Sequence, residues 1–384
     1  MATRDLPAIF EEFDEARRAG FVKVMNFKES GGRLVGYLCS YTPIEVIEAA
    51  GASGVALCGM SNEPVAEAET VLPKNLCPLI KSTYGFAHAD KCPYTYFSDL
   101  IVGETTCDGK KKMYELLNEI KDTYVMQLPQ GQGRAWVAEA WREEVRLLKE
   151  EFERRFGVEV TDDDLRCAAR ARNRFRRAMV ELFELQANVP PAMSGVEMMT
   201  TALQSTFAFD VNESIEKVES LLEARRAAYE AGERPISVEA KRILLTGCPS
   251  SGVIKKVGMS IERNGGVIVC LDDCSGERTQ RMMIDPDADD ILGAIADRYL
   301  GIHCSVMTPN GGRMENTAAM CEKYHVDGVV DLTLTACHTF AVESELMRRK
   351  MEEIGVPYLH IETDYAPGDQ GQIDTRIAAF IEML

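Results

Sequence analysis

The sequence predicts an α/β fold with two parallel-sheet domains joined by a helical section. Short apolar segments typical of strands alternate with helix-like segments near both ends of the chain, and the middle is rich in amphipathic helices. Strands that alternate with helices are typical of parallel sheets. A chain of 384 residues is long enough for two or three domains. We expect a first α/β domain over residues 1–130, a helical section over 131–238 and a second α/β domain over 239–384.

The first domain is expected to contain four strands. They are predicted at residues 33–38, 54–58, 99–102 and 124–128. A helix is expected over Pro43–Ala50, since proline suits the first helical position. Thr42 and Glu45 have the spacing of a capping box at its start.

The helical section and the second domain have different patterns. From about residue 134 to 232, apolar residues recur at three- and four-residue spacing in charged surroundings, which predicts long amphipathic helices. The second domain opens with the strand-like segments RILLTG and GVIVCLDD and continues with helices over 289–300 and 315–324. It ends as strand VVDLTL, a helix, strand VPYLHIE and the helix QIDTRIAAFIEML. No tandem sequence repeat is evident.

Charge and hydropathy argue against several classes of function and location. A formal charge of -18 argues against binding to a nucleic-acid backbone, which requires clustered Lys and Arg. No apolar run approaches the roughly 20 residues of a membrane span. The amino terminus has neither the basic start nor the apolar stretch of a signal peptide. We therefore expect a cytoplasmic protein that binds neither membranes nor nucleic acids.

Twelve cysteines are many for a cytoplasmic chain, because disulfides are rare in a reducing compartment. None are spaced as CxxC, so neither a zinc ribbon nor a ferredoxin-type cluster motif is indicated. Any one cysteine could also be a small buried hydrophobic residue. The settings of the cysteines are therefore more informative than their number.

Several cysteines lie where a predicted strand gives way to a helix. Cys39, Cys107 and Cys337 follow strands and precede helices, while Cys77 and Cys92 are each followed by proline. Ligands of parallel α/β sheets bind at the carboxyl ends of the strands, and helix N-termini there favour thiolates. These settings predict an anionic iron–sulfur cluster in one site between the two domains. Scattered structural cysteines are the alternative.

Four segments carry a resemblance to a known superfamily. GYLCSYTPIEVIEAAGA, LPKNLCPLIKSTYGFA, ETTCDGKKKMYELL and the carboxyl-terminal ACHTF…GVPYLHIETDY…GQIDTRIAAFIEML resemble the 2-hydroxyacyl-CoA dehydratase and benzoyl-CoA reductase superfamily. The resemblance covers nearly the whole chain and implies two Rossmann-like domains with a helical insert. In dehydratase subunits of this superfamily, three cysteines hold one [4Fe–4S] cluster. By motif these correspond to Cys77, Cys107 and Cys337.

Three further cysteines, Cys39, Cys92 and Cys304, have similarly distinctive surroundings. The set of six resembles the double-cubane branch of the superfamily, which implies an [8Fe–9S] cluster of two cubanes sharing a bridging sulfide. Six thiolates and one bridging sulfide fill the eight iron positions of two cubanes. Cys39 could instead line the site without binding iron. The other six cysteines are left outside the cluster. Four are expected in the core or in helices (Cys58, Cys167, Cys270, Cys321), while Cys248 and Cys274 follow strands, as ligands do, and could line the site without binding iron.

Two histidines adjoin proposed ligands. His303 and His338 could each donate a proton to a substrate or a hydrogen bond to a cluster sulfur, and a purely structural role is the alternative. The segment Asp272–Arg278 resembles a superfamily loop near the substrate, although a generic acidic turn would look similar.

The sequence carries neither a GxxxxGK[ST] loop nor a convincing GxGxxG motif, so no nucleotide site is expected in this chain. The resemblance implies a separate iron–sulfur ATPase as electron donor, and a homodimer. The expected function is ATP-coupled, low-potential reduction of a small molecule. One alternative is a 2-hydroxyacyl-CoA dehydratase subunit with a single [4Fe–4S] cluster. The other is a non-catalytic electron carrier or redox sensor.

Overall fold

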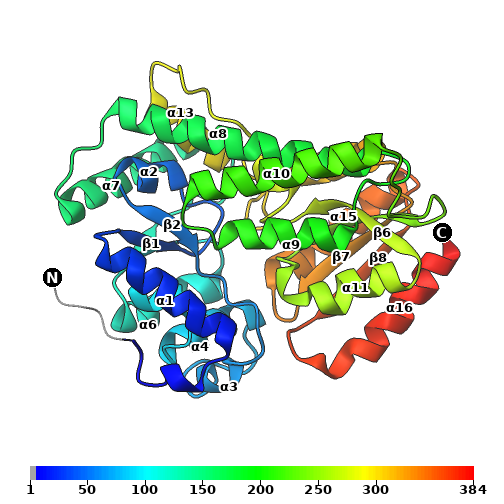
Figure 1. Ribbon diagram of the computed structural model, residues 1–384, viewed down its shortest axis with the longest axis horizontal. Coiled ribbons are helices and arrows are strands. Elements are labelled where there is room, and N and C mark those ends of the chain that lie inside the picture. Colours follow the sequence, from blue (N-terminus) through cyan, green and yellow to red (C-terminus); the bar gives the residue numbers. More distant parts are fainter. Residues whose placement is uncertain (1–5) are drawn as a thin grey trace. The chain divides into compact units, whose positions relative to one another are not determined.

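The computed structural model, which describes residues 6–384, contains two four-stranded sheets whose strands are all parallel (Figure 1). Each sheet belongs to one of two compact units. Unit 1 is the chain up to Arg172 together with 284–301, and unit 2 is 173–283 together with 302–384. The predicted α/β class with two Rossmann-like parallel-sheet domains is confirmed.

The sheet of unit 1 has the strand order β2-β1-β3-β4. Its strands are β1 (Leu34–Tyr37), β2 (Ser53–Ala56), β3 (Leu100–Glu104) and β4 (Thr123–Met126). The chain first steps from β1 to β2, then crosses back to place β3 on the other side of β1. The order therefore reverses between β1 and β3, and such a reversal is where parallel sheets bind ligands at their carboxyl ends.

Helices cover the sheet of unit 1. They are α1 (Glu15–Glu29), α2 (Ile44–Ala49), α3 (Val65–Ala68), α4 (Pro78–His88), α5 (Pro93–Phe97), α6 (Asp108–Ile120), α7 (Ala135–Phe156), α13 (Ile291–Leu300) and the first part of α8 (Asp162–Glu184), with the short η1 (Phe10–Glu12). Tyr114 of α6 packs on Gly103 of β3, where an added Cβ would lie 2.6 Å from the tyrosine ring. This close contact packs the middle of α6 against the carboxyl end of β3.

The sheet of unit 2 has the order β6-β5-β7-β8. Its strands are β5 (Lys241–Gly247), β6 (Gly266–Asp272), β7 (Gly328–Leu334) and β8 (Tyr358–Thr363). Every residue of β6 and β7 is buried. The near-continuous apolar run of each strand reflects a parallel sheet covered on both faces.

Unit 2 contains the remaining helices. They are the rest of α8, α9 (Gly195–Thr206), α10 (Val211–Glu230), α11 (Met259–Arg263), α12 (Glu277–Gln280), α14 (Gly311–Lys323), α15 (His338–Glu353) and α16 (Gln370–Met383), with the short turns η2 (Leu185–Ala187), η3 (Ser251–Val253), η4 (Ile254–Gly258) and η5 (Pro367–Asp369). Side chains of α14 and α15 form one buried cluster with β5, β6 and β7. Helices α11 and α16 lie side by side (Figure 1).

The two units share one topology. Strands β5, β6, β7 and β8 take the same order in their sheet as β1, β2, β3 and β4 in theirs. The two units therefore repeat the same strand order, although the sequence shows no tandem repeat. Residues 131–238 are largely helical, and the helices within them are divided between the two units: α7 lies in unit 1, α9 and α10 lie in unit 2, and α8 spans both.

The predicted capping box at α2 is wrong. The N-cap residue is Pro43, which makes no side-chain capping bond. Thr42 instead donates a hydrogen bond to Glu104 of β3, and Glu45 accepts one from the Tyr299 hydroxyl at 2.7 Å. Both side chains are fully buried, so tertiary partners outcompete the local capping contacts.

Among the helices of residues 6–384, none is both long enough and apolar enough to span a lipid bilayer.

Candidate functional site

Cysteines follow three adjacent strands at the carboxyl edge of the first sheet. Cys39 comes two residues after β1, Cys58 two residues after β2, and Cys107 three residues after β3. Cys39 and Cys107 therefore flank the position where the strand order reverses. Cys58 lies beyond the end of its strand, and not within it as the sequence suggested.

Cys77 and Cys107 occupy equivalent places on two helices. Each is an N-cap residue, Cys77 of α4 and Cys107 of α6. The two helix starts lie side by side, because an added Cβ on Gly109 would come within 2.8 Å of the Leu76 side chain. The N-terminal ends of both helices carry unsatisfied N–H groups and a partial positive charge, which stabilise a thiolate or an anionic cluster.

A half-buried lysine lies among these cysteines. Lys110, in the first turn of α6, donates a hydrogen bond to the carbonyl oxygen of Leu38, the residue before Cys39. Burial works against its charge, but the acidic groups around it raise its pKa above the ordinary value. Those groups are Tyr114, Cys39, Cys58 and Glu104. A fixed positive charge thus sits beside the sulfur atoms.

Two buried oxygen atoms next to Lys110 lack hydrogen-bond partners within residues 6–384. They are the Tyr114 hydroxyl and one carboxylate oxygen of Glu104, whose residues are 1% and 0% exposed. The other Glu104 oxygen accepts from Thr42. Burial raises the pKa of Glu104 to about 7. Unpartnered buried polar atoms are costly, so their retention here indicates a polar group in the neighbourhood that the chain itself does not supply.

Cys92 lies apart from Cys77. It follows the C-terminal end of α4 whereas Cys77 precedes its start, so the eleven residues of that helix, about 16 Å, separate them. Cys92 accepts hydrogen bonds from Thr95 and interacts with Arg17 of α1. Burial nevertheless raises the pKa of its thiol.

In unit 2, Cys248 and Cys337 meet at the carboxyl end of β7. Cys248 directly follows β5, and its sulfur accepts a hydrogen bond from the backbone N–H of Leu334 at 3.3 Å. Leu334 is the last residue of β7, and its carbonyl oxygen accepts from the backbone N–H of Cys337 at 2.9 Å. Cys337 is the N-cap residue of α15.

Cys304 is connected to the same place through two hydroxyl groups. The hydroxyl of its neighbour Ser305 donates to Thr339 at 2.9 Å, and the Thr339 oxygen lies 3.9 Å from the Cys337 sulfur. Asn310 donates to the carbonyl oxygen of Cys304 at 3.0 Å, which fixes the loop.

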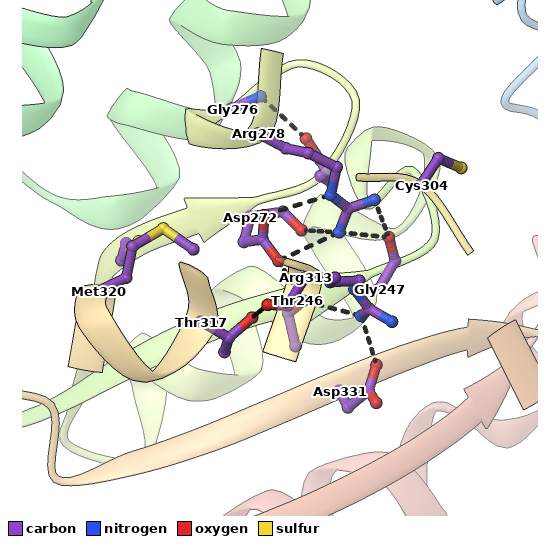
Figure 2. A network of polar contacts seen from close by, with 12 residues as sticks. Thr246, Gly247, Asp272, Gly276, Arg278, Cys304, Arg313, Thr317, Met320 and Asp331 are labelled. Atoms are coloured by element: carbon purple, nitrogen blue, oxygen red, sulfur yellow. Dashed lines mark hydrogen bonds and ion pairs between the residues drawn. The ribbon is translucent and has the colours of Figure 1, made fainter. Parts of the chain in front are cut away.

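A buried arginine lies among the cysteines of unit 2. Figure 2 shows the Arg278 guanidinium bonded to Asp272, at 3.1 and 3.2 Å, with Cys304 nearby. Burial works against its charge, but Asp272 first, and then Cys274 and Cys304, raise its pKa. Asp272 and Arg278, at the two ends of the predicted loop, therefore form a buried ion pair.

A second buried arginine, Arg313, lies next to this ion pair. Arg313, 1% exposed, donates to the Thr246 hydroxyl at 3.0 Å, and lies 3.8 Å from Asp331 (Figure 2). Arg278 and Arg313 both stack on Phe340, with 5.5 and 4.9 Å between guanidinium carbon and ring centre. Arg313 also forms an ion pair with Glu343, so both arginines are held in a buried network of opposite charges.

The two predicted histidines have different surroundings. His303 is half-buried against Gly312, where an added Cβ would lie 2.2 Å from its ring. Its Nδ1 atom is buried without a hydrogen-bond partner in the described chain, and burial, then the charge of Arg278, lower its pKa. His338, the first residue of α15, is exposed.

Each unit therefore has several cysteines just after its strands or at the starts of neighbouring helices, whereas Cys92 lies apart. The sequence predicted Cys58 in the core of a strand, whereas it is only half-buried and follows β2; Cys248 directly follows β5, as expected. Cys270 and Cys321 are buried against Met320 and Met351, as expected of core residues. Within residues 6–384, no three His, Cys, Asp or Glu side chains are arranged to hold a metal ion. Three of the donors, Cys77, Cys107 and Cys337, are N-cap residues, and thiolates at helix N-termini suit an iron–sulfur cluster by their chemistry.

Comparisons with known proteins show the family of the chain. Residues 39–384 match the family model described as 2-hydroxyglutaryl-CoA dehydratase, D-component. The chain is 47% identical over 381 residues, 99% of each protein, to a protein of Escherichia coli (strain K12) provisionally named dehydratase subunit YjiM. It is 26% identical to the beta chain of (R)-phenyllactyl-CoA dehydratase from Clostridium sporogenes, over 94% of each. It is also 26% identical to the B chain of benzoyl-CoA reductase from Thauera aromatica, over 74% of this chain and 70% of that protein.

Proposed function

Because the chain belongs to the superfamily of 2-hydroxyacyl-CoA dehydratases and benzoyl-CoA reductases, we propose that it is an iron–sulfur reductase with a double-cubane [8Fe–9S] cluster. The observation that carries the proposal is the repeated placement of cysteines after adjacent parallel strands in both units. One unit with a single group of three would supply only the ligands of a [4Fe–4S] cluster.

The chain's residues have separate roles in this proposal. Cys39, Cys77, Cys107, Cys304 and Cys337 hold the cluster, and Cys92 is the sixth ligand that the sequence suggests. When bound, the cluster supplies electrons at low potential. Lys110 and Arg278, held by Leu38 and Asp272, offset negative charge beside the sulfur atoms. His303, with a lowered pKa, is neutral at pH 7 and is placed to hold or pass a proton. His338, exposed beside Cys337, is the second candidate proton donor.

The electrons require a strong donor. Iron–sulfur potentials reach about -700 mV, against a cytosolic thiol poise near -300 mV. For two electrons, a gap of about 400 mV corresponds to on the order of 18 kcal/mol. Thiols do not supply this, and the chain has no nucleotide-binding motif. We propose that a separate iron–sulfur ATPase delivers the electrons to a homodimer of this chain.

The second candidate function is that of a 2-hydroxyacyl-CoA dehydratase subunit with one [4Fe–4S] cluster. The description of the matching family model and the names of the first two relatives favour it. In that reaction the electron is recycled, so no net reduction occurs.

An assay with the complete system separates the two functions. The chain, an iron–sulfur ATPase activator, ATP and a strong reductant are combined anaerobically, with compact unsaturated molecules or with 2-hydroxyacyl-CoA. We expect ATP-dependent reduction of a small unsaturated molecule. Dehydration of the thioester without reduction of any small molecule would assign the chain to the dehydratase function. Activity in neither assay, from a chain loaded with iron, would favour an electron carrier.

A further inference from the structure

We infer that Cys248, and not Cys92, supplies the sixth thiolate, so that each unit holds one cubane through three cysteines in matching places. Unit 1 uses Cys39, Cys77 and Cys107, and unit 2 uses Cys248, Cys304 and Cys337. The inference rests on the proposed function, because it assigns the ligands of the proposed cluster.

The strand order that the two sheets share assigns Cys248 a counterpart in unit 1. In unit 1 the strand order reverses between β1 and β3, which are followed by Cys39 and Cys107. In unit 2 it reverses between β5 and β7, which are followed by Cys248 and Cys337. Cys107 and Cys337 each come three residues after their strand and are N-cap residues of the next helix. Cys248 is thus the counterpart of Cys39 at the second reversal, where parallel sheets bind ligands.

The third cysteine of each set comes from the crossover between the second and third strands of its sheet. Cys77 lies between β2 and β3, and Cys304 lies between β6 and β7. Cys92 also lies in the first crossover, as the N-cap residue of α5. The second crossover contains two further cysteines, Cys274 just after β6 and Cys321 within α14, and neither is an N-cap residue. Cys304 is not an N-cap residue either, so position in the crossover leaves it as the counterpart of Cys77 or of Cys92, and the surroundings of Cys92 decide between the two.

Contacts in unit 2 bring its three cysteines to one place. The Cys248 sulfur accepts from Leu334 N–H at 3.3 Å, three residues before Cys337. The loop of Cys304 reaches Cys337 through Ser305 and Thr339. Backbone N–H bonds to sulfur are one of the interactions that tune iron–sulfur potentials. Cys248 already receives such a bond, and its side chain is 1% exposed.

Cys92 is poorly placed for the set in unit 1. The length of α4, about 16 Å, lies between its segment and Cys77. Its neighbours Arg17 and Thr95 belong to α1 and α5, whereas Lys110 and Tyr114 of α6 interact with Cys39, and Tyr114 with Cys107 as well.

Cys58 and Cys274 form another matching pair, each two residues after the edge strands β2 and β6. They lie outside the reversals of strand order. The Cys58 thiol donates to the Leu38 carbonyl at 3.7 Å. This pair borders the sites without being needed as ligands.

The test compares Cys248→Ala and Cys92→Ala by iron content. Both variants and the wild-type chain are reconstituted anaerobically, and iron and acid-labile sulfide are counted per chain, with electron paramagnetic resonance of the reduced samples. Cys270→Ala is the matched control, because Cys270 is as buried as Cys248 but lies within strand β6, in the core of the same unit. Urea unfolding of the iron-free variants separates loss of a ligand from loss of folding.

We expect Cys92→Ala and Cys270→Ala to retain about eight irons per chain, and Cys248→Ala to lose about half of them. Iron loss from Cys92→Ala with full retention by Cys248→Ala, on a wild-type background of eight irons, overturns the inference and leaves the proposed function standing. A wild-type count of four overturns the double-cubane proposal and the division into two cubanes together. If Cys248→Ala is too unstable to purify, Cys248→Ser is measured against the same two outcomes.

Discussion

Glu104 is completely buried, and one of its carboxylate oxygens has no hydrogen-bond partner within residues 6–384, while the other accepts from Thr42. Sequence spacing assigned Thr42 to a local capping box, and the partner it has in the structure is 62 residues away. Such a pairing depends on β1 and β3 being neighbours in the sheet, which local propensity does not encode. At the scale of residues, strand-to-helix positions predicted the cysteines, but the charges that surround them emerge only from tertiary contacts.

Replacing Glu104 by Gln should stabilise the iron-free chain at high pH. The pKa of Glu104 is raised from 4.5 to about 7, so the folded state binds more protons than the unfolded state between these values. Its contribution to stability is therefore present below about pH 4.5 and is lost as the pH rises through 7. In urea unfolding at pH 8, Glu104→Gln should exceed the wild type by roughly 1–3 kcal/mol, with a much smaller difference at pH 5. The exposed Glu119→Gln should change little, and equal stability of Glu104→Gln and wild type at pH 8 would contradict the buried-carboxylate account.

At the scale of elements, most strands and helices begin and end within a few residues of the positions expected from apolar periodicity. The exceptions are instructive. Strand β2 ends at Ala56, which leaves Cys58 in the loop at the carboxyl edge. Strand β5 ends at Gly247 with φ +115°, a conformation that L side chains rarely adopt. Apolar content predicts where a strand lies, but it does not show where the chain turns out of the sheet.

Gly247→Ala tests how tightly the end of β5 positions Cys248. An added Cβ would lie 2.1 Å from the carbonyl oxygen of Leu332 in β7, so the strands must separate in addition to the strain at φ. We expect a loss of about 2–4 kcal/mol in the free energy of unfolding of the iron-free chain. Gly265→Ala is the matched control, because Gly265 has φ +90° but nothing within 4 Å of an added Cβ. It should cost only about 1–2 kcal/mol. Equal losses in the two variants would show that the contact with β7 does not constrain this turn.

At the scale of the whole molecule, the sequence predicted two parallel-sheet domains, and it missed that they follow the same chain path. The repeat lies in strand order and in the positions of cysteines after strands, whereas the segments between those cysteines differ in length. Cys77 comes 21 residues after β2, and Cys304 comes 32 residues after β6. A search for a fixed sequence period cannot detect such a repeat, because the period is not constant.

The most direct test of the account is the amount of iron and acid-labile sulfide that the purified chain holds under strictly anaerobic conditions. Two cubanes joined by a bridging sulfide predict about eight irons and nine sulfides per chain. Saturation at about four irons would contradict the double-cubane cluster and support a dehydratase subunit with one [4Fe–4S] cluster. Zinc bound in place of iron would contradict the iron–sulfur account altogether.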